Sequence, residues 1–163
     1  TLLPVYCLQQ GFTAEVALAM VSTVVVGDAL LQLPIGALAD YLPRRTLFLG
    51  CAVLLLLSSL AIAPLLDTWL IWPIWVLFGA SAGGLFTLSL ILIGERYRDD
   101  ALVRANAHVA QLWGIGCLIG PLVAGAGSQW ISGHALPLLM AAGALGLVVL
   151  LLRQGAFGAA QPA

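Results

Sequence analysis

Among the residues of this sequence, one aspartate inside a long apolar stretch is the strongest candidate for a functional role. Asp28 lies twelve residues before Asp40, which ends the stretch. At 1.5 Å of helical rise per residue, Asp28 would lie about 18 Å from Asp40, near the middle of a bilayer. An ionisable group there costs about 2.5 kcal/mol or more to insert, so Asp28 is expected to face a cavity or a polar partner. Gln32 lies one helical turn away on the same face.

Three interpretations of Asp28 stay open at this point. Asp28 either carries proton coupling or a substrate contact, or forms a structural hydrogen bond between helices, or lies at a shallower depth than the count implies. A second polar group comes from a later apolar stretch and consists of Asn106, His108 and Gln111. Their amide and imidazole groups donate and accept hydrogen bonds, so we expect them to line the same pathway as Asp28.

No residue pattern indicates an enzyme. The sequence contains no Gly-x-Ser-x-Gly and no His-Glu-x-x-His pattern. Asp99 and Asp100 are adjacent carboxylates, but no second acidic motif follows, so we expect them to cap a helix and charge a loop. We therefore expect no catalytic residue and no cofactor.

Glycines and cysteines also have plain structural explanations. Gly114, Gly116 and Gly120 are spaced almost like a dinucleotide fingerprint, but they lie inside an apolar helical segment instead of after a strand. We expect them to permit close helix packing. The three cysteines lie far apart in apolar sequence, at Cys7, Cys51 and Cys117. Their spacing fits no metal site, and we expect all three to be buried small residues.

The composition indicates a protein dissolved in lipid. Of the 163 residues, 62% are hydrophobic and 8% are charged. A soluble domain of this length could not hide so much apolar surface behind so few charges. The net charge of −1 gives no reason to expect a nucleic-acid partner. The expected surroundings are therefore a lipid bilayer.

Apolar segments and turn signals divide the chain into six spans, of which the first is partial. The expected bounds are 1–10 (partial), 13–40, 46–63, 69–96, 100–125 and 135–152, with a disordered tail at 154–163. Residues 79–84 (GASAGG) carry a small-x-x-x-small pattern that predicts close contact with another helix. The pattern predicts an all-α polytopic transmembrane bundle.

The basic residues predict the orientation of this bundle. All six are arginines and fall beside alternate loops or after the last span: Arg44, Arg45, Arg96, Arg98, Arg104 and Arg153. Positive residues gather on the cytoplasmic side, so we expect these arginines and the C-terminus there. The expected location is a bacterial inner (plasma) membrane.

The loop from Gly36 to Arg45 reads GALADYLPRR. Gly36 and Asp40 lie four residues apart on one helical face, and Gly36 is expected to let a neighbouring backbone approach. Pro43 stops the helix, and two adjacent arginines, Arg44 and Arg45, follow it.

This loop resembles the G-x-x-x-D-x-x-G-R-R signature of the major facilitator superfamily, found between the second and third helices of each six-helix half. Gly36, Asp40, Arg44 and Arg45 match it, whereas Pro43 replaces the second glycine and Tyr41 the usual basic residue. Residues 104–125 also resemble the penultimate helix of bacterial members. Because the C-terminal copy of the signature is the more degenerate one, the resemblance implies the C-terminal half, with an inverted three-plus-three helix repeat.

The resemblance also implies a function. It implies a secondary active transporter that moves a small solute by alternating access, coupled to protons, with the site at the interface with an N-terminal half. It implies that the first, second, fourth and fifth helices line the pathway, and that Glu95 bonds Arg44 or Arg45 as a cytoplasmic latch. A solvated loop charge is the alternative for Glu95. A non-transporting membrane scaffold or assembly protein is the alternative function.

Overall fold

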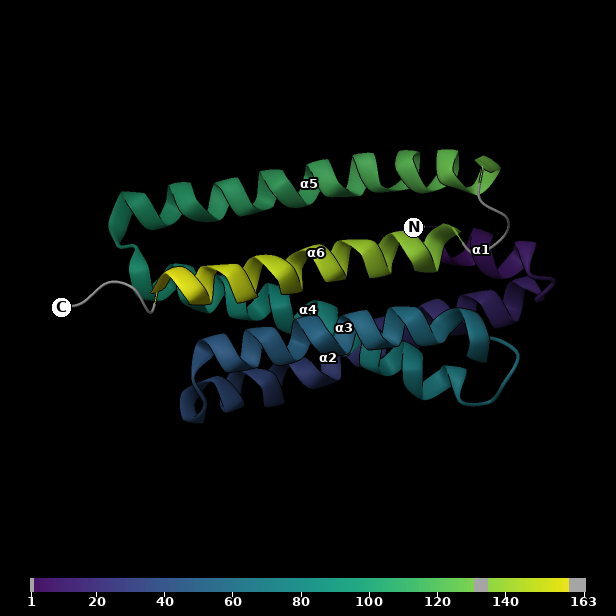
Figure 1. The fold of residues 1–163 in the computed structure, drawn as a ribbon, viewed down its shortest axis with the longest axis horizontal. Helices are drawn as coiled ribbons and strands as arrows, with labels where there is room; N and C mark the ends of the chain where they lie inside the picture. Colours follow the sequence, from purple (N-terminus) through teal and green to yellow (C-terminus); the bar gives the residue numbers. More distant parts are fainter. Residues whose placement is uncertain (1, 131–134, 159–163) are drawn as a thin grey trace.

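The computed structural model describes residues 2–130 and 135–158, and these form an elongated bundle of six helices (Figure 1). The helices are α1 (Leu3–Gln9), α2 (Ala14–Tyr41), α3 (Arg44–Leu65), α4 (Ile71–Arg96), α5 (Asp99–Trp130) and α6 (Ala135–Gly158). No strand occurs among the described residues. The predicted all-α bundle is confirmed.

Length and composition suit several of these helices for a membrane. Within the described residues, four segments are long and apolar enough to cross a membrane: Ala14–Tyr41, Arg44–Leu65, Ile71–Arg96 and Leu136–Arg153. Helix α5 has 32 residues, and its N-terminal half carries the polar residues Asn106, His108 and Gln111. The bundle therefore buries backbone polar groups in helical hydrogen bonds, as lipid requires.

Helix ends follow local capping chemistry only in part. The Thr13 hydroxyl accepts a hydrogen bond from the Val16 amide at 3.5 Å and so caps α2. By contrast, α4 begins at Ile71 with no side-chain cap, because Thr68 bonds back to the Leu65 carbonyl. The expected start at residue 69 is therefore two residues too early.

The last two helices extend past their expected ends. Helix α5 continues to Trp130 instead of ending near residue 125, and α6 continues to Gly158. Residues 154–158 are thus helical, whereas the sequence predicts a disordered tail from residue 154. The rest of that tail, 159–163, and residues 131–134 of the expected last loop lie outside the described residues.

The closest helix contact in the bundle is between α2 and α4, and glycines on both helices make it possible. A Cβ atom at Gly79 would overlap the Val24 carbonyl, and one at Gly27 would lie 2.8 Å from the Val76 Cα atom. The close contact predicted for residues 79–84 is confirmed. We call this contact, formed by Gly27 on α2 and Gly79, Gly83 and Gly84 on α4, the glycine seam.

Helix α5 lies apart from the others along most of its length (Figure 1). Its side chains from residue 110 to residue 120 are all exposed, including Leu112 at 68%. One contact with α4 is a tilted aromatic pair, in which the Phe86 and Trp113 ring centroids lie 5.2 Å apart. Among the described residues, no atom of another helix lies within 4 Å of a Cβ built at Gly114, Gly116 or Gly120, so the predicted close packing of these glycines is wrong.

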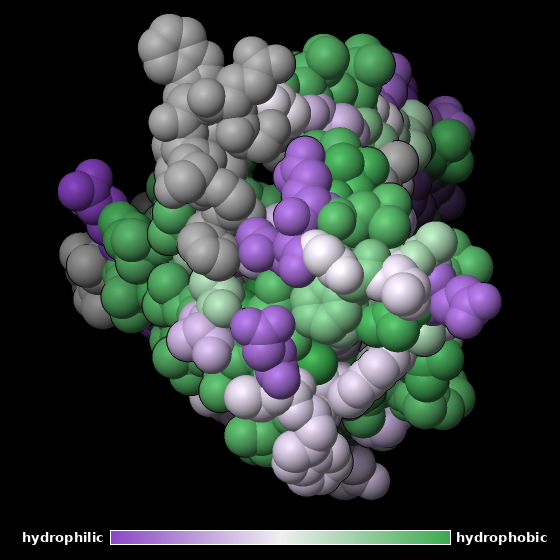
Figure 2. Space-filling model, turned by 90° about the vertical axis from the view of Figure 1, so that its right-hand side faces the viewer, coloured by the Kyte–Doolittle hydropathy of each residue, from purple (hydrophilic) through white to green (hydrophobic). Residues whose placement is uncertain are grey.

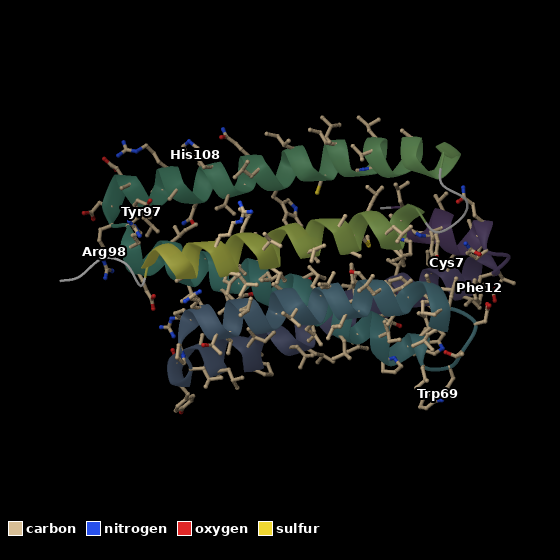
Figure 3. All side chains as sticks on the ribbon, in the orientation of Figure 1. Cys7, Phe12, Trp69, Tyr97, Arg98 and His108 are labelled. Atoms are coloured by element: carbon tan, nitrogen blue, oxygen red, sulfur yellow. The ribbon has the colours of Figure 1, made fainter. Side chains whose placement is uncertain are left out.

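The two ends of the bundle differ in charge. The α2–α3 and α4–α5 turns lie at one end together with the end of α6, so Arg44, Arg98 and Arg153 share that end (Figures 1 and 3). Cys7, Phe12 and Trp69 lie at the opposite end (Figure 3). Viewed from that opposite end, the surface is largely apolar with scattered hydrophilic side chains (Figure 2).

Candidate functional site

The polar centre of the glycine seam is a hydrogen bond between Asp28 and Gln32. The Gln32 amide Nε2 donates to the Asp28 carboxylate Oδ1 at 2.7 Å, one helical turn apart on α2, and both side chains are half-buried. The carboxylate lies directly against Gly83 of α4. Asp28 therefore has the polar partner that its surroundings demand, and it faces a neighbouring helix.

The polar residues of α5 lie elsewhere. Asn106, His108 and Gln111 are exposed, and His108 lies on the outer side of α5 (Figure 3). The His108 Nδ1 atom donates to the Arg104 carbonyl at 2.6 Å, which fixes the ring against its own helix. The structure thus divides the expected pathway residues into two groups, one in the glycine seam and one on the exposed face of α5.

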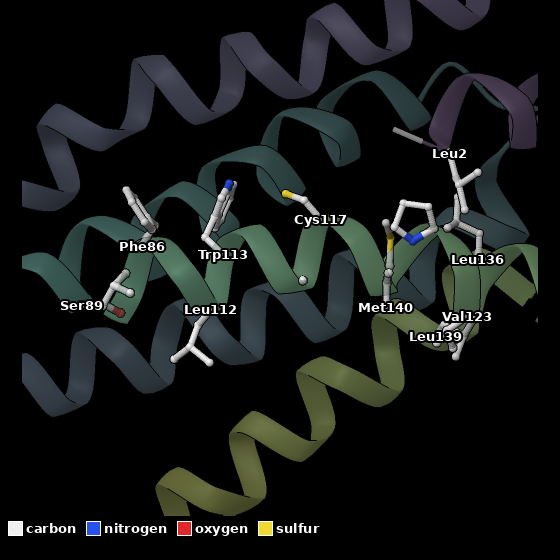
Figure 4. Close-up of a pocket in the computed structure, with 14 residues that line it drawn as sticks. Leu2, Phe86, Ser89, Leu112, Trp113, Cys117, Val123, Leu136, Leu139 and Met140 are labelled. Carbon is white, nitrogen blue, oxygen red and sulfur yellow. The ribbon is translucent and has the colours of Figure 1, made fainter. Parts of the chain in front are cut away.

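A cavity of about 890 Å³ opens between α4, α5 and α6 (Figure 4). Its walls are mostly apolar and include Phe86, Trp113, Cys117 and Met140. The Ser89 hydroxyl also lines it, but that hydroxyl already donates to the Leu85 carbonyl at 2.7 Å. None of the polar residues that the sequence singles out lines this cavity.

The α2–α3 turn at the arginine-rich end is held by two contacts between residues that are far apart in the sequence. The Arg44 guanidinium meets the Glu95 carboxylate, with Nη2 at 2.5 Å and Nε at 3.1 Å from the same oxygen. Arg45 donates to the Leu151 carbonyl at 3.4 Å. Two adjacent arginines at the start of α3 therefore tie α3 to both α4 and α6.

Two other residues of the same loop make no such contact. Asp40 is exposed and forms no ion pair with any described residue. No described residue of another helix has an atom within 4 Å of a Cβ built at Gly36, so no described backbone approaches there. The close approach expected at Gly36 occurs instead at Gly27, nine residues earlier on the same helix.

The cysteines separate into two classes. Cys7 and Cys51 are buried, as the sequence predicts, whereas Cys117 is exposed on the cavity side of α5. The prediction of burial is wrong for Cys117 because α5 packs on its neighbours at few points. Among the described residues, no group of three His, Cys, Asp or Glu side chains could hold a metal ion.

Comparison with known proteins identifies the family. The sequence model of the Major Facilitator Superfamily matches residues 1–162. The chain belongs to the major facilitator superfamily. The superfamily's proteins are integral membrane transporters, in agreement with the four described segments that are long and apolar enough to cross a membrane.

Individual relatives of this superfamily are distant and much longer. An efflux pump named dotC from Dothistroma septosporum is 30% identical over 91 residues, which cover 56% of this chain and 16% of the pump. An MFS-type transporter from Aspergillus terreus is 27% identical over 99 residues, covering 61% of this chain and 18% of the relative. The uncharacterized MFS-type transporter YfkF from Bacillus subtilis is 26% identical over 125 residues, which cover 75% of this chain and 31% of the relative. No solved structure gives a significant match.

Gly27 and Gly83 are site residues of the structure that the sequence does not predict. The signal for Gly83 was present, because Gly79 and Gly83 lie four residues apart and so share one helical face. For Gly27, the signal was its position next to Asp28 on a helix that is apolar on all sides. In this member of the superfamily, Gly27 lets the α4 backbone approach beside Asp28, and Gly83 leaves room for the Asp28 carboxylate.

Proposed function

We propose that this chain is the C-terminal half-bundle of a secondary active transporter that moves a small solute by alternating access, coupled to protons. The observation that carries this proposal is the half-buried Asp28 carboxylate between α2 and α4 in a superfamily member. An ionisable group at this depth is expensive to keep and marks a proton or substrate pathway. The partners are a solute, protons, the bilayer and an N-terminal half.

The hydrogen bond to Gln32 suits a group that changes its protonation state. Gln32 donates to Asp28 when the carboxylate is charged. A side-chain amide also has a carbonyl oxygen, so Gln32 can accept from Asp28 after the carboxyl is protonated. The pair thus keeps a hydrogen bond in both states, which lowers the cost of moving a proton within the membrane.

The direction of transport that we would test first is export. The relative named as an efflux pump supports this choice. The arginine-rich end supports a cytoplasmic position for the α2–α3 and α4–α5 turns, because positive residues are retained on that side. We place the protein in the plasma membrane of a bacterium, with the C-terminus of the chain in the cytoplasm.

The function is tested with the purified full-length protein in sealed vesicles that contain a pH-sensitive dye. We expect one class of small organic solute from a screened panel to change the internal pH when it is added, and a protonophore to abolish its accumulation. A rate of solute movement that does not change with an imposed pH gradient would contradict proton coupling. A folded protein that moves no solute would instead support a scaffold role.

We propose further that the Arg44–Glu95 pair acts as a latch on the cytoplasmic face. Glu95→Arg should lower the initial transport rate several-fold, because a third cation then lies beside Arg44 and Arg45. The double variant Arg44→Glu, Glu95→Arg restores opposite charges and should recover most of that rate. Arg96→Glu is the matched control, since Arg96 is the next residue of α4 and forms no ion pair with a described residue. A double variant no faster than Glu95→Arg would exclude the latch.

A further inference from the structure

The glycine seam contains one glycine that faces a charged side chain. A Cβ atom at Gly83 would overlap Oδ1 of Asp28 and would lie 2.7 Å from its Cγ atom. The same Cβ would be 3.2 Å from Nε2 of Gln32. Both members of the hydrogen-bonded pair therefore converge on the space that the absent side chain of Gly83 leaves open.

The register of the two helices explains this placement. Gly79 lies against the Val24 carbonyl, and Gly83, one turn further along α4, lies against Asp28, one turn further along α2. The backbone contact at Gly79 holds the helices so close that a carboxylate fits between them only where the opposite residue has no side chain. Gly83 provides that opening.

We propose that Gly83 is a positioning residue, whose lack of a side chain keeps the Asp28 carboxylate between α2 and α4 in hydrogen-bonding contact with Gln32. The consequence for transport rests on the proposed function, whereas the positioning itself does not. Gly83 touches neither solute nor proton in this scheme. It acts through Asp28 by fixing where that carboxylate lies.

The other seam glycines meet different atoms, which makes the proposal testable. Gly27 and Gly79 face backbone atoms, which cannot rotate away. Gly84 faces the tip of the Ile35 side chain at 2.6 Å and the Cys51 sulfur at 3.2 Å. Gly84→Ala is therefore the matched control for Gly83→Ala, because it adds the same methyl group at the neighbouring position without meeting Asp28.

A double-mutant cycle on thermal unfolding of the full-length protein tests the positioning. Gly83→Ala should lower the Tm by several degrees when Asp28 is present, and by less than about 1 °C in an Asp28→Ala background, because the displaced group is then gone. Gly84→Ala should shift the Tm equally in both backgrounds. If Gly83→Ala alone does not fold, we expect folded protein to return in the double variant. An equal loss at Gly83 in both backgrounds overturns the proposal, as does a double variant that stays unfolded.

Transport assays separate a positioning role from a purely structural one. Gly83→Ala should reduce uphill accumulation several-fold and keep solute exchange, whereas Gly84→Ala should leave both at the level of the unmodified protein. Equal losses of accumulation and exchange in Gly83→Ala would overturn the positioning role. If Asp28→Asn accumulates solute normally, the proton-coupling proposal fails, yet the unfolding cycle still decides whether Gly83 positions Asp28.

Discussion

Gly79→Ala will destabilise the chain by about 3 kcal/mol, whereas the same substitution at Gly50 will be neutral or stabilising. A Cβ at Gly79 would overlap the Val24 carbonyl oxygen and lie 2.9 Å from its carbon, so α2 and α4 must separate to admit it. At Gly50 on α3, a Cβ would have no atom of another helix within 4 Å in the described part of the chain. There, alanine should gain up to about 1 kcal/mol from helix propensity alone.

The opposite signs make this comparison informative, since both variants add one methyl group to a helical glycine. Thermal unfolding in detergent measures it, with a Tm about 6–12 °C lower for Gly79→Ala. Gly27→Ala should behave like Gly79→Ala, because a Cβ there would lie 2.8 Å from the Val76 Cα atom. A Gly79→Ala protein as stable as Gly50→Ala would mean that α2 and α4 are further apart than the structure has them.

Asp28→Asn will abolish uphill accumulation of solute and leave solute exchange and folding intact. Asparagine keeps the size of aspartate and can accept from Gln32, but it cannot gain or lose a proton at neutral pH. If Asp28 carries the coupled proton, the accumulation ratio should fall at least about tenfold, which corresponds to about 1.4 kcal/mol of lost coupling. Accumulation and counterflow exchange in vesicles measure the two activities separately.

A matched control for this variant is available at the end of the bundle that lies away from the arginines. Asp67→Asn makes the same chemical change at an exposed position in the α3–α4 turn, and it should leave accumulation unchanged. Normal accumulation by Asp28→Asn would show that coupling resides elsewhere and that Asp28 serves as a contact between helices. Loss of both accumulation and exchange would point to a substrate contact instead.

The sequence was sufficient to predict the helices and the ion pair found among the described residues. Long apolar segments, Pro43 and the charged turns determined six helices, and the loop signature with Glu95 indicated the contact with Arg44 that the structure contains. The small residues from Gly79 to Gly84 also indicated a close helix contact. These features depend on local chemistry and on motif spacing, which a single sequence displays directly.

The rotation of α2 could not be predicted in the same way. Most of its side chains are apolar on every side, so periodicity does not distinguish the face toward α4 from the face toward lipid. For this reason the sequence predicts the close approach at Gly36, whereas in the structure it occurs at Gly27. Likewise, the polar side chains of Asp28 and Gln111 predict a shared pathway, although the polarity of a residue does not determine which neighbour its side chain faces.

The three cysteines differ in exposure, so a spectroscopic probe can be attached selectively to one of them. Cys7 and Cys51 are 0% and 8% exposed, whereas Cys117 is exposed at the wall of the cavity between α4, α5 and α6 (Figure 4). A fluorophore attached at Cys117 would sit one helical turn from Trp113, whose indole can quench it or transfer energy to it. Because α4 and α6 form the other walls of this cavity, the emission of a dye at Cys117 would also report how closely these two helices enclose it.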